Sequence, residues 1–189
     1  MRRRVTLLLL AAIAAFLVFG ATALASTPEE NAVRGILAAY RSPLPWWTIT
    51  AFKGSHEEFD IAGYLTVAFC ESDYGTIGKS KTFNNPGNII ARPRTYEPWR
   101  VWWTWQTGTF ISAGRAFGVY SDPYTGQRAL IRLLYDHPNG YNGLLHEHQW
   151  YAFASAYSGP GPGLDAYVAD LVAAHARIVK QAAACGLAW

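Results

Sequence analysis

The sequence predicts a mainly helical fold of the α+β class, in which a small β-hairpin lobe interrupts a helical body. Helix-start signals precede segments whose apolar residues recur at helical spacing. Only the segment from Ala91 to Tyr120 instead has the aromatic-rich, turn-punctuated pattern of strands. We find no internal repeat and no second domain boundary, so residues 26–189 are expected to form one domain with a real core.

The first 25 residues have the composition of a secretory signal peptide. M-R-R-R is followed by an apolar run from Val5 to Phe19 and by the small-residue site A-L-A, which predicts cleavage after Ala25. The alternative is an uncleaved anchor, since Val5 to Ala25 is nearly long enough to cross a bilayer. Both interpretations place the remaining chain outside the cytoplasm, secreted or in the cell wall or periplasm. With cleavage, we expect no stable membrane association.

Removing residues 1–25 also removes the positive net charge. Three of the sixteen basic residues lie there, which leaves thirteen bases against the thirteen acids of the whole chain. A neutral protein has no long-range field that would attract nucleic acid or anionic lipid. We therefore expect no nucleic-acid partner, and expect any bound polymer to be held by stacking and hydrogen bonds. We also expect a monomer.

Capping signals mark the first helices. T-P-E-E at 27–30 predicts a helix that ends before Pro43 and Pro45. S-H-E-E at 55–58 predicts the start of a second helix, which is apolar over so much of its surface that it should be buried. This second helix carries Glu71 at its C-terminal end, where Gly75 is expected to turn the chain away.

Two strands and three more helices are expected after residue 91. R-V-W-W-T-W-Q and F-I-S-A-G-R-A-F-G-V-Y are predicted as strands joined by a turn at T-G, Thr107 and Gly108. S-D-P at 121–123 begins a helix that ends at D-H-P-N-G. A short helix over 147–157 and a final helix from about Leu164 to Ala184 complete the chain.

Four motifs, in order, resemble those of a known family. E-S-D-Y-G-T at 71–76 resembles the E-S-x-x-G-x-S/T signature of lysozyme-like peptidoglycan hydrolases. N-N-P-G-N-I at 84–89 is similar to the N-N-x-F-G-I stretch of their glucosaminidase group, glycoside hydrolase family 73 (mannosyl-glycoprotein endo-β-N-acetylglucosaminidase-like), and to N-N-P-G-N-I of phage muramidases. F-G-V-Y-S-D-P-Y-T-G at 117–126 and A-Y-S-G-P-G at 156–161 resemble later segments of that group. The likeness spans about 59–178 and implies a lysozyme-like domain.

The resemblance makes Glu71 the candidate catalytic acid. Cleavage of a glycosidic bond needs a carboxylic acid that stays protonated near neutral pH. Burial raises a carboxyl pKa, and the partial negative charge at a helix C-terminus has the same effect. The alternative is a solvated glutamate that merely ends a helix.

The second carboxylate matches the family less well. Where many members carry T-x-E on the first strand of the β-lobe, this chain has T-W-Q, and the amide of Gln106 cannot act as a general base. Glu97 lies on the same excursion and is a candidate substitute. The other possibilities are the N-acetyl group of the substrate, or intramolecular attack as in lytic transglycosylases.

Several polar and aromatic residues are candidates for substrate contact. Asn85 could contact Glu71 or an N-acetyl group of the substrate, although an Asx turn explains it too, and Asn84 beside it is a candidate for substrate contact. Tyr157 corresponds to the cleft tyrosine of the family, with a core tyrosine as the alternative. Trp102 is the ring of the aromatic run 96–105 most suited to stack on a sugar, and Gln106 would lie beside the substrate.

The cysteines allow one possible disulfide, and the spacing of the histidines does not indicate a metal site. Cys70 and Cys185 could form a long-range disulfide, or remain separate thiols. H-E-H at 146–148 lacks the H-E-x-x-H spacing that places two histidines on one helix face, so we expect neither metal nor cofactor.

The expected function is secreted glycosidase activity on the peptidoglycan backbone of N-acetylglucosamine and N-acetylmuramic acid, with Glu71 as general acid. The resemblance favours an endo-β-N-acetylglucosaminidase. The alternatives are a lytic transglycosylase or muramidase acting on the same polymer, and a catalytically weak module that binds peptidoglycan.

Overall fold

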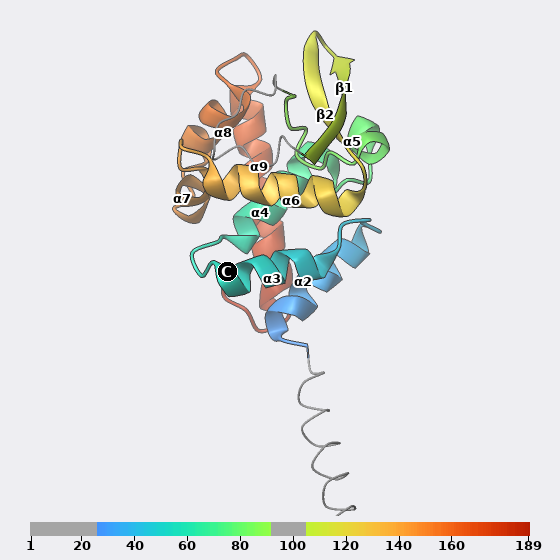
Figure 1. Ribbon diagram of the computed structural model, residues 1–189. Coiled ribbons are helices and arrows are strands. Elements are labelled where there is room, and N and C mark those ends of the chain that lie inside the picture. Colours follow the sequence, from blue (N-terminus) through green and yellow to red (C-terminus); the bar gives the residue numbers. More distant parts are fainter. Residues whose placement is uncertain (1–25, 92–104) are drawn as a thin grey trace, which may run out of the picture.

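The computed structural model describes residues 26–91 and 105–189 of the chain. This part is mainly helical with one two-stranded antiparallel sheet, which confirms the predicted α+β class (Figure 1). Residues 1–25, for which a signal peptide is predicted, lie outside the described residues. No helix in the described ranges is both long and apolar enough to cross a membrane. The elements, in order, are α2 (Pro28–Ala39), α3 (Trp46–Ser55), α4 (Ile61–Ser72), α5 (Gly78–Phe83), β1 (Gln106–Ser112), β2 (Arg115–Tyr120), α6 (Pro123–Asp136), α7 (Tyr141–His146), α8 (Trp150–Ser158) and α9 (Leu164–Ala183).

The centre of the fold is the packing of α4 against α9. Every residue of α4 from Ile61 to Ala68 is buried, as the run of apolar residues predicts. The long α9 contributes Leu171, Ala174 and Ile178 to the same core. The other helices surround this pair, with α2 and α3 on one side and α7 and α8 on another (Figure 1). This arrangement holds the C-terminal end of α4 rigidly in place.

The first capping box forms as predicted. The Glu30 amide donates to Thr27 Oγ1 at 3.1 Å, and the Thr27 amide donates to Glu30 Oε2 at 2.9 Å. These two bonds satisfy backbone donors that the first helical turn would otherwise leave unpaired. Helix α2 therefore begins at Pro28, the residue that the sequence indicates.

The prediction that S-H-E-E at 55–58 begins a helix is wrong. Ser55 is the last residue of α3, a helix over Trp46–Ser55 that the sequence pattern did not predict, and α4 begins only at Ile61. The Ser55 hydroxyl lies within hydrogen-bonding distance of the Phe52 carbonyl oxygen, at 3.1 Å, behind it in α3. The Lys53 side chain donates to the carbonyl oxygens of Glu57 and Phe59, which fixes the loop between the two helices.

The turn of the hairpin lies six residues beyond the predicted T-G. Thr107 and Gly108 are inside β1, and the chain reverses at Ala113 and Gly114, with Ser112 paired to Arg115. Both turn residues have positive φ, 49° and 73°. Two consecutive residues of positive φ match the right-handed twist of a hairpin, which explains why the chain turns here. Most of the first predicted strand lies outside the described residues.

Beyond the hairpin the prediction is accurate for α6 and α9. Asp122 caps α6 by accepting from the Thr125 amide at 2.8 Å, with Pro123 as the first helical residue. Helix α9 over Leu164–Ala183 is within one residue of the predicted range. The short helices α5 and α7 were not predicted.

One glycine of α6 explains how closely this helix approaches the loop after α5. A Cβ atom on Gly126 would lie 1.7 Å from the backbone oxygen of Asn84 and 3.1 Å from Pro86 Cδ. A backbone atom cannot give way as a flexible side chain can. Only glycine therefore allows α6 to pack against this loop.

We expect Gly126→Ala to destabilise the protein by about 1–3 kcal/mol or more, since it overpacks a contact with backbone. The matched control is Gly35→Ala in the exposed face of α2, where no atom lies within 4 Å of the added Cβ. That change should be neutral or stabilise by up to about 1 kcal/mol, because alanine favours helix. Urea unfolding of both variants measures the difference, and equal midpoints would contradict it.

Candidate functional site

The last turn of α4 places Glu71 at the end of the buried helix. Asp73 and Tyr74, directly after α4, both adopt left-handed backbone conformations with φ of 46° and 57°, and Gly75 follows with φ of 77°. The Tyr74 amide closes the helix by donating to the Ala68 carbonyl at 3.0 Å. Left-handed conformations cost energy in non-glycine residues. Burial of the Tyr74 ring, which is 1% exposed, helps to offset that cost.

Two donors from distant segments hold the Glu71 carboxyl group. The Tyr167 hydroxyl, on α9, donates to Oε1 at 2.6 Å. The Asn88 Nδ2 amide donates to Oε2 at 3.0 Å and to the Glu71 backbone oxygen at 2.7 Å. Both oxygens of the carboxyl group are thus oriented, which fixes the side chain in one position.

The surroundings favour the protonated form of Glu71. Burial among protein atoms raises the pKa of the Glu71 carboxyl above its ordinary value near 4.5, and the hydrogen bonds from Tyr167 and Asn88 oppose this in part. Glu71 as a whole residue is only partly buried, so it keeps a partial opening to solvent. A carboxylic acid that is desolvated yet still reachable is suited to give a proton to a bound ligand.

The loop 84–90 is fastened to the end of α4 by Ser72. This hydroxyl is 1% exposed, lies 2.7 Å from the Pro86 carbonyl oxygen, and accepts from the Gly75 amide at 2.8 Å. The same loop is fixed to α6, because a Cβ on Gly87 would lie 2.4 Å from Leu130 Cδ1. Both contacts hold the loop that carries Asn88.

The asparagine that reaches Glu71 is Asn88, not Asn84 or Asn85. Asn85 is fully buried, and its Nδ2 donates to the carbonyl oxygens of Ile89 and Gly118, both at 3.0 Å. Its side chain therefore has no hydrogen left for a substrate. Asn84 ends α5 in a left-handed conformation and donates to the Tyr120 carbonyl at 3.1 Å. The expectation that Asn85 contacts Glu71 is wrong, because its side chain ties the loop to β2.

Neither Tyr157 nor Gln106 hydrogen bonds to the Glu71 carboxyl group, which accepts from Tyr167 and Asn88. The Tyr157 hydroxyl donates to the Gly87 carbonyl at 2.6 Å, so this tyrosine supports the loop from α8. Burial, and then the charge of Glu71, raises the Tyr157 pKa well above 10. Gln106 begins β1 and is paired with Tyr120, and its buried Nε2 has no hydrogen-bond partner among the described residues.

Glu97 and Trp102 lie outside the described residues. In the described part of the chain, no second carboxylate hydrogen bonds to Glu71 or contributes to the shift of its pKa. The candidate roles of Glu97 as second carboxylate and of Trp102 as sugar platform therefore stay predictions.

Of the two alternatives for Cys70 and Cys185, the structure has separate thiols and no disulfide between them. Cys70 is half-buried near Asp170 and Arg177 of α9, and burial raises its pKa to about 12, with the Glu71 charge adding to the effect. Cys185 is exposed and follows the end of α9, roughly 12 Å beyond Arg177 along the helix axis at 1.5 Å per residue. A disulfide needs Cα atoms within about 7 Å.

Two of the residues that hold Glu71 were missed by sequence reasoning. Asn88 stands within the N-N-P-G-N motif and closes its turn, because the Asn88 amide donates to the Asn85 carbonyl oxygen at 3.2 Å. Tyr167 has no local signal, because it lies 96 residues from Glu71 in the chain. In the described ranges, no group of three or more histidine, cysteine or acidic side chains could hold a metal ion.

Comparison with family models, with curated proteins and with solved structures finds no match to this chain. The function is therefore inferred from the geometry around Glu71 and from the sequence motifs.

We expect Tyr167→Phe to raise the Glu71 pKa further, because the hydroxyl stabilises the charged form. Titration of the carboxyl carbon by NMR measures this directly. Tyr151→Phe is the matched control, since it removes the same atom from an exposed ring of α8. A Glu71 pKa that falls or stays constant in Tyr167→Phe would contradict the assigned contact.

Glu71→Gln should change how stability depends on pH. With its pKa raised on folding, the wild-type glutamate binds a proton more tightly in the folded state, so stability is lost as pH rises from about 4.5 through the raised pKa. Glutamine carries no charge, so the variant should match wild type at low pH and become the more stable protein at neutral pH. Each unit of pKa elevation corresponds to about 1.4 kcal/mol. Thermal unfolding from pH 3 to 8 tests this, with exposed Glu57→Gln as control.

Proposed function

We propose that the protein is a secreted, lysozyme-like glycosidase that cleaves the peptidoglycan backbone, with Glu71 as general acid. The observation that carries the proposal is a carboxyl group that is desolvated at the end of a buried helix and oriented by Tyr167 and Asn88. In the motif E-S-D-Y-G-T, which resembles the signature of lysozyme-like peptidoglycan hydrolases, Glu71 corresponds to the catalytic glutamate. No metal or cofactor takes part in this proposal.

The chemistry assigns a distinct role to each residue. Protonated Glu71 would donate to the glycosidic oxygen as the bond breaks, leaving a carboxylate. Tyr167 and Asn88 would then stabilise that carboxylate through the hydrogen bonds that they already make. Ser72 acts through the loop and is a positioning residue. Burial and hydrogen bonding thus oppose each other, and the balance sets the pKa at which Glu71 works.

The reaction subtype depends on whether a second carboxylate assists Glu71. The proposed type is an endo-β-N-acetylglucosaminidase, with Glu97 as candidate second carboxylate. The environment of Glu71 in the described residues has a single carboxylate, which also suits a lytic transglycosylase, where the same group acts as acid and then base. A muramidase is the third form of the same proposal. The substrate would be extracytoplasmic peptidoglycan strands, bound by a monomer.

Glu71→Gln should lower the release of soluble muropeptides from purified peptidoglycan by roughly a hundredfold or more, the contribution of a general acid. Pull-down with insoluble peptidoglycan should show unchanged binding. Glu57→Gln, on the exposed loop before α4, is the matched control and should keep full activity. Mass spectrometry of the product ends separates reducing glucosamine, reducing muramic acid and anhydromuramic acid.

Two outcomes would contradict the proposal. Binding without any release by the wild-type protein would identify a peptidoglycan-binding module. Release that is equally fast in Glu71→Gln would exclude Glu71 as the acid.

A further inference from the structure

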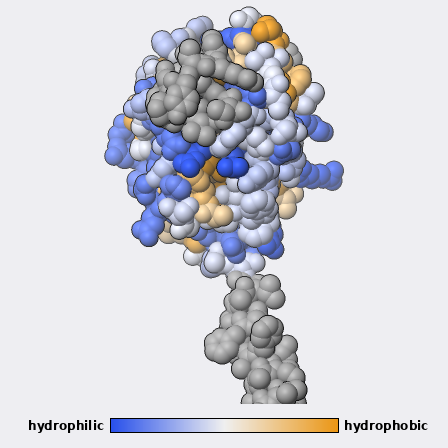
Figure 2. Space-filling model, in the orientation of Figure 1, coloured by the Kyte–Doolittle hydropathy of each residue, from blue (hydrophilic) through white to orange (hydrophobic). Residues whose placement is uncertain are grey.

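A second concave site lies between α3 and α6, separate from the residues that hold Glu71. It encloses about 350 Å³, within the range of sites for small ligands. Its apolar surface comes from Trp47, Phe52 and Ile131, among others. Figure 2 shows an apolar strip between these two helices, bordered by hydrophilic side chains. We call this site the α3–α6 groove.

Two arginines give the α3–α6 groove its positive charge. Arg128 and Arg132 line it from α6, His56 lines it from the loop after α3, and none of the lining residues carries a carboxylate. Arg128 is exposed and lies over the rings of Trp105 and Tyr124, at 4.5 and 5.3 Å from their centroids. Stacking orients its guanidinium group without using its hydrogen-bond donors.

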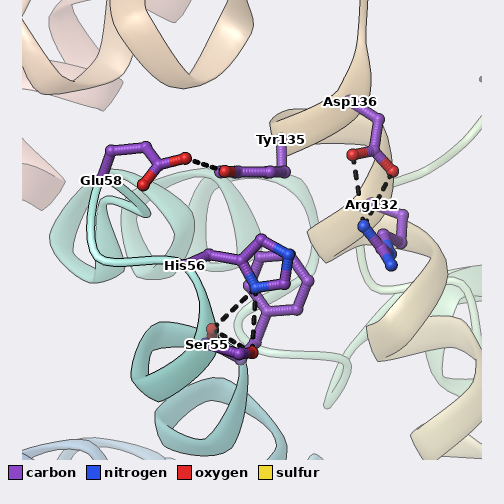
Figure 3. A network of polar contacts seen from close by, with 7 residues as sticks. Ser55, His56, Glu58, Arg132, Tyr135 and Asp136 are labelled. Atoms are coloured by element: carbon purple, nitrogen blue, oxygen red, sulfur yellow. Dashed lines mark hydrogen bonds and ion pairs between the residues drawn. The ribbon is translucent and has the colours of Figure 1, made fainter.

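Of these two arginines, Arg132 alone has a carboxylate partner within the described ranges, and the contact is long. Its NH1 lies 3.3 Å from both oxygens of Asp136, so its other nitrogens stay available (Figure 3). At the same end, Tyr135 donates to Glu58, so that this carboxylate is already bound (Figure 3). The groove therefore has spare donors for an anion.

A buried hydroxyl at the groove also lacks a partner. Thr48 is 8% exposed, lines the groove, and its Oγ1 has no hydrogen-bond partner among the described residues. Leaving such a group unpaired is costly, and a ligand amide or carbonyl would satisfy it. This observation is independent of the arginines.

We propose that the α3–α6 groove binds the acidic stem peptide of the peptidoglycan substrate. Guanidinium groups match the geometry of carboxylates, the apolar walls suit short side chains such as alanine, and Thr48 can bond a peptide group. A neutral glycan strand would leave the two arginines unused. The choice of this peptide, among acidic peptides, depends on the function proposed above.

Calorimetric titration of the full chain with the tripeptide L-alanyl-γ-D-glutamyl-L-lysine tests the assignment. We expect the tripeptide to bind and its form with amidated carboxylates not to bind. Arg128→Gln should weaken binding by about tenfold or more, since a charge-assisted pair is lost. Arg34→Gln is the matched control, because Arg34 also stacks on a tryptophan, Trp46 at 4.2 Å, but does not line the groove.

Arg128→Lys keeps the charge and should bind with intermediate affinity. Equal binding of the acidic and amidated peptides, or unchanged affinity in both Arg128→Gln and Arg132→Gln, would overturn the assignment. So would displacement of the peptide by chitotetraose, which would make the groove a glycan site. Peptide binding by a wild-type protein that releases no muropeptides would reject the proposed function and keep the groove as a site for acidic peptides. Muropeptide release without peptide binding would reject the groove as a peptide site and keep the proposed function.

Discussion

The structure depends on the attachment of the loop 84–90 to three elements at once. Ser72 holds it to the end of α4, Asn85 holds it to β2, and Gly87 allows Leu130 of α6 to pack directly against it. The amide of Gly118 in β2 also donates to the Ile89 carbonyl at 2.9 Å. The loop therefore ties the hairpin to the helices and fixes Asn88 against Glu71.

The same packing determines the chemistry of Glu71. Burying a charge is costly, so the elements that close around the carboxyl group raise its pKa. Those elements also supply the two donors, Tyr167 and Asn88, that limit the effect. Helix α6 separates this region from the α3–α6 groove, since Leu130 packs beside Gly87 while Arg128 and Ile131 line the groove. One rigid helix therefore relates the two candidate sites.

Sequence reasoning succeeded where the signal is local and failed where it is tertiary. Thr27 and Asp122 cap helices through neighbours three residues away, so their roles can be read from the sequence alone. S-H-E-E has the same local form, yet Ser55 ends a helix, because backbone carbonyls of α3 compete for its hydroxyl. The turn at Ala113 and Gly114 was missed because Gly108 offers a second glycine in the same segment, and local sequence does not decide between them.

The candidate site divides in the same way. Glu71 is identifiable from its motif and from the apolar helix that precedes it. The sequence could not identify which of the three asparagines contacts Glu71, because burial decides it. Asn85 faces the interior, and Asn88 faces the carboxyl group. Tyr167 could be found only once α9 was known to pack against α4.

The residues that hold Glu71 are far apart along the chain, so its raised pKa can arise only after they have come together on folding. Glu71 meets one partner 17 residues away and another 96 residues away. An extended chain, such as one in transit across a membrane, exposes every carboxyl group to water and gives each an ordinary acidity. The unusual proton affinity of Glu71 is thus a property that the chain acquires only when its last long helix has docked.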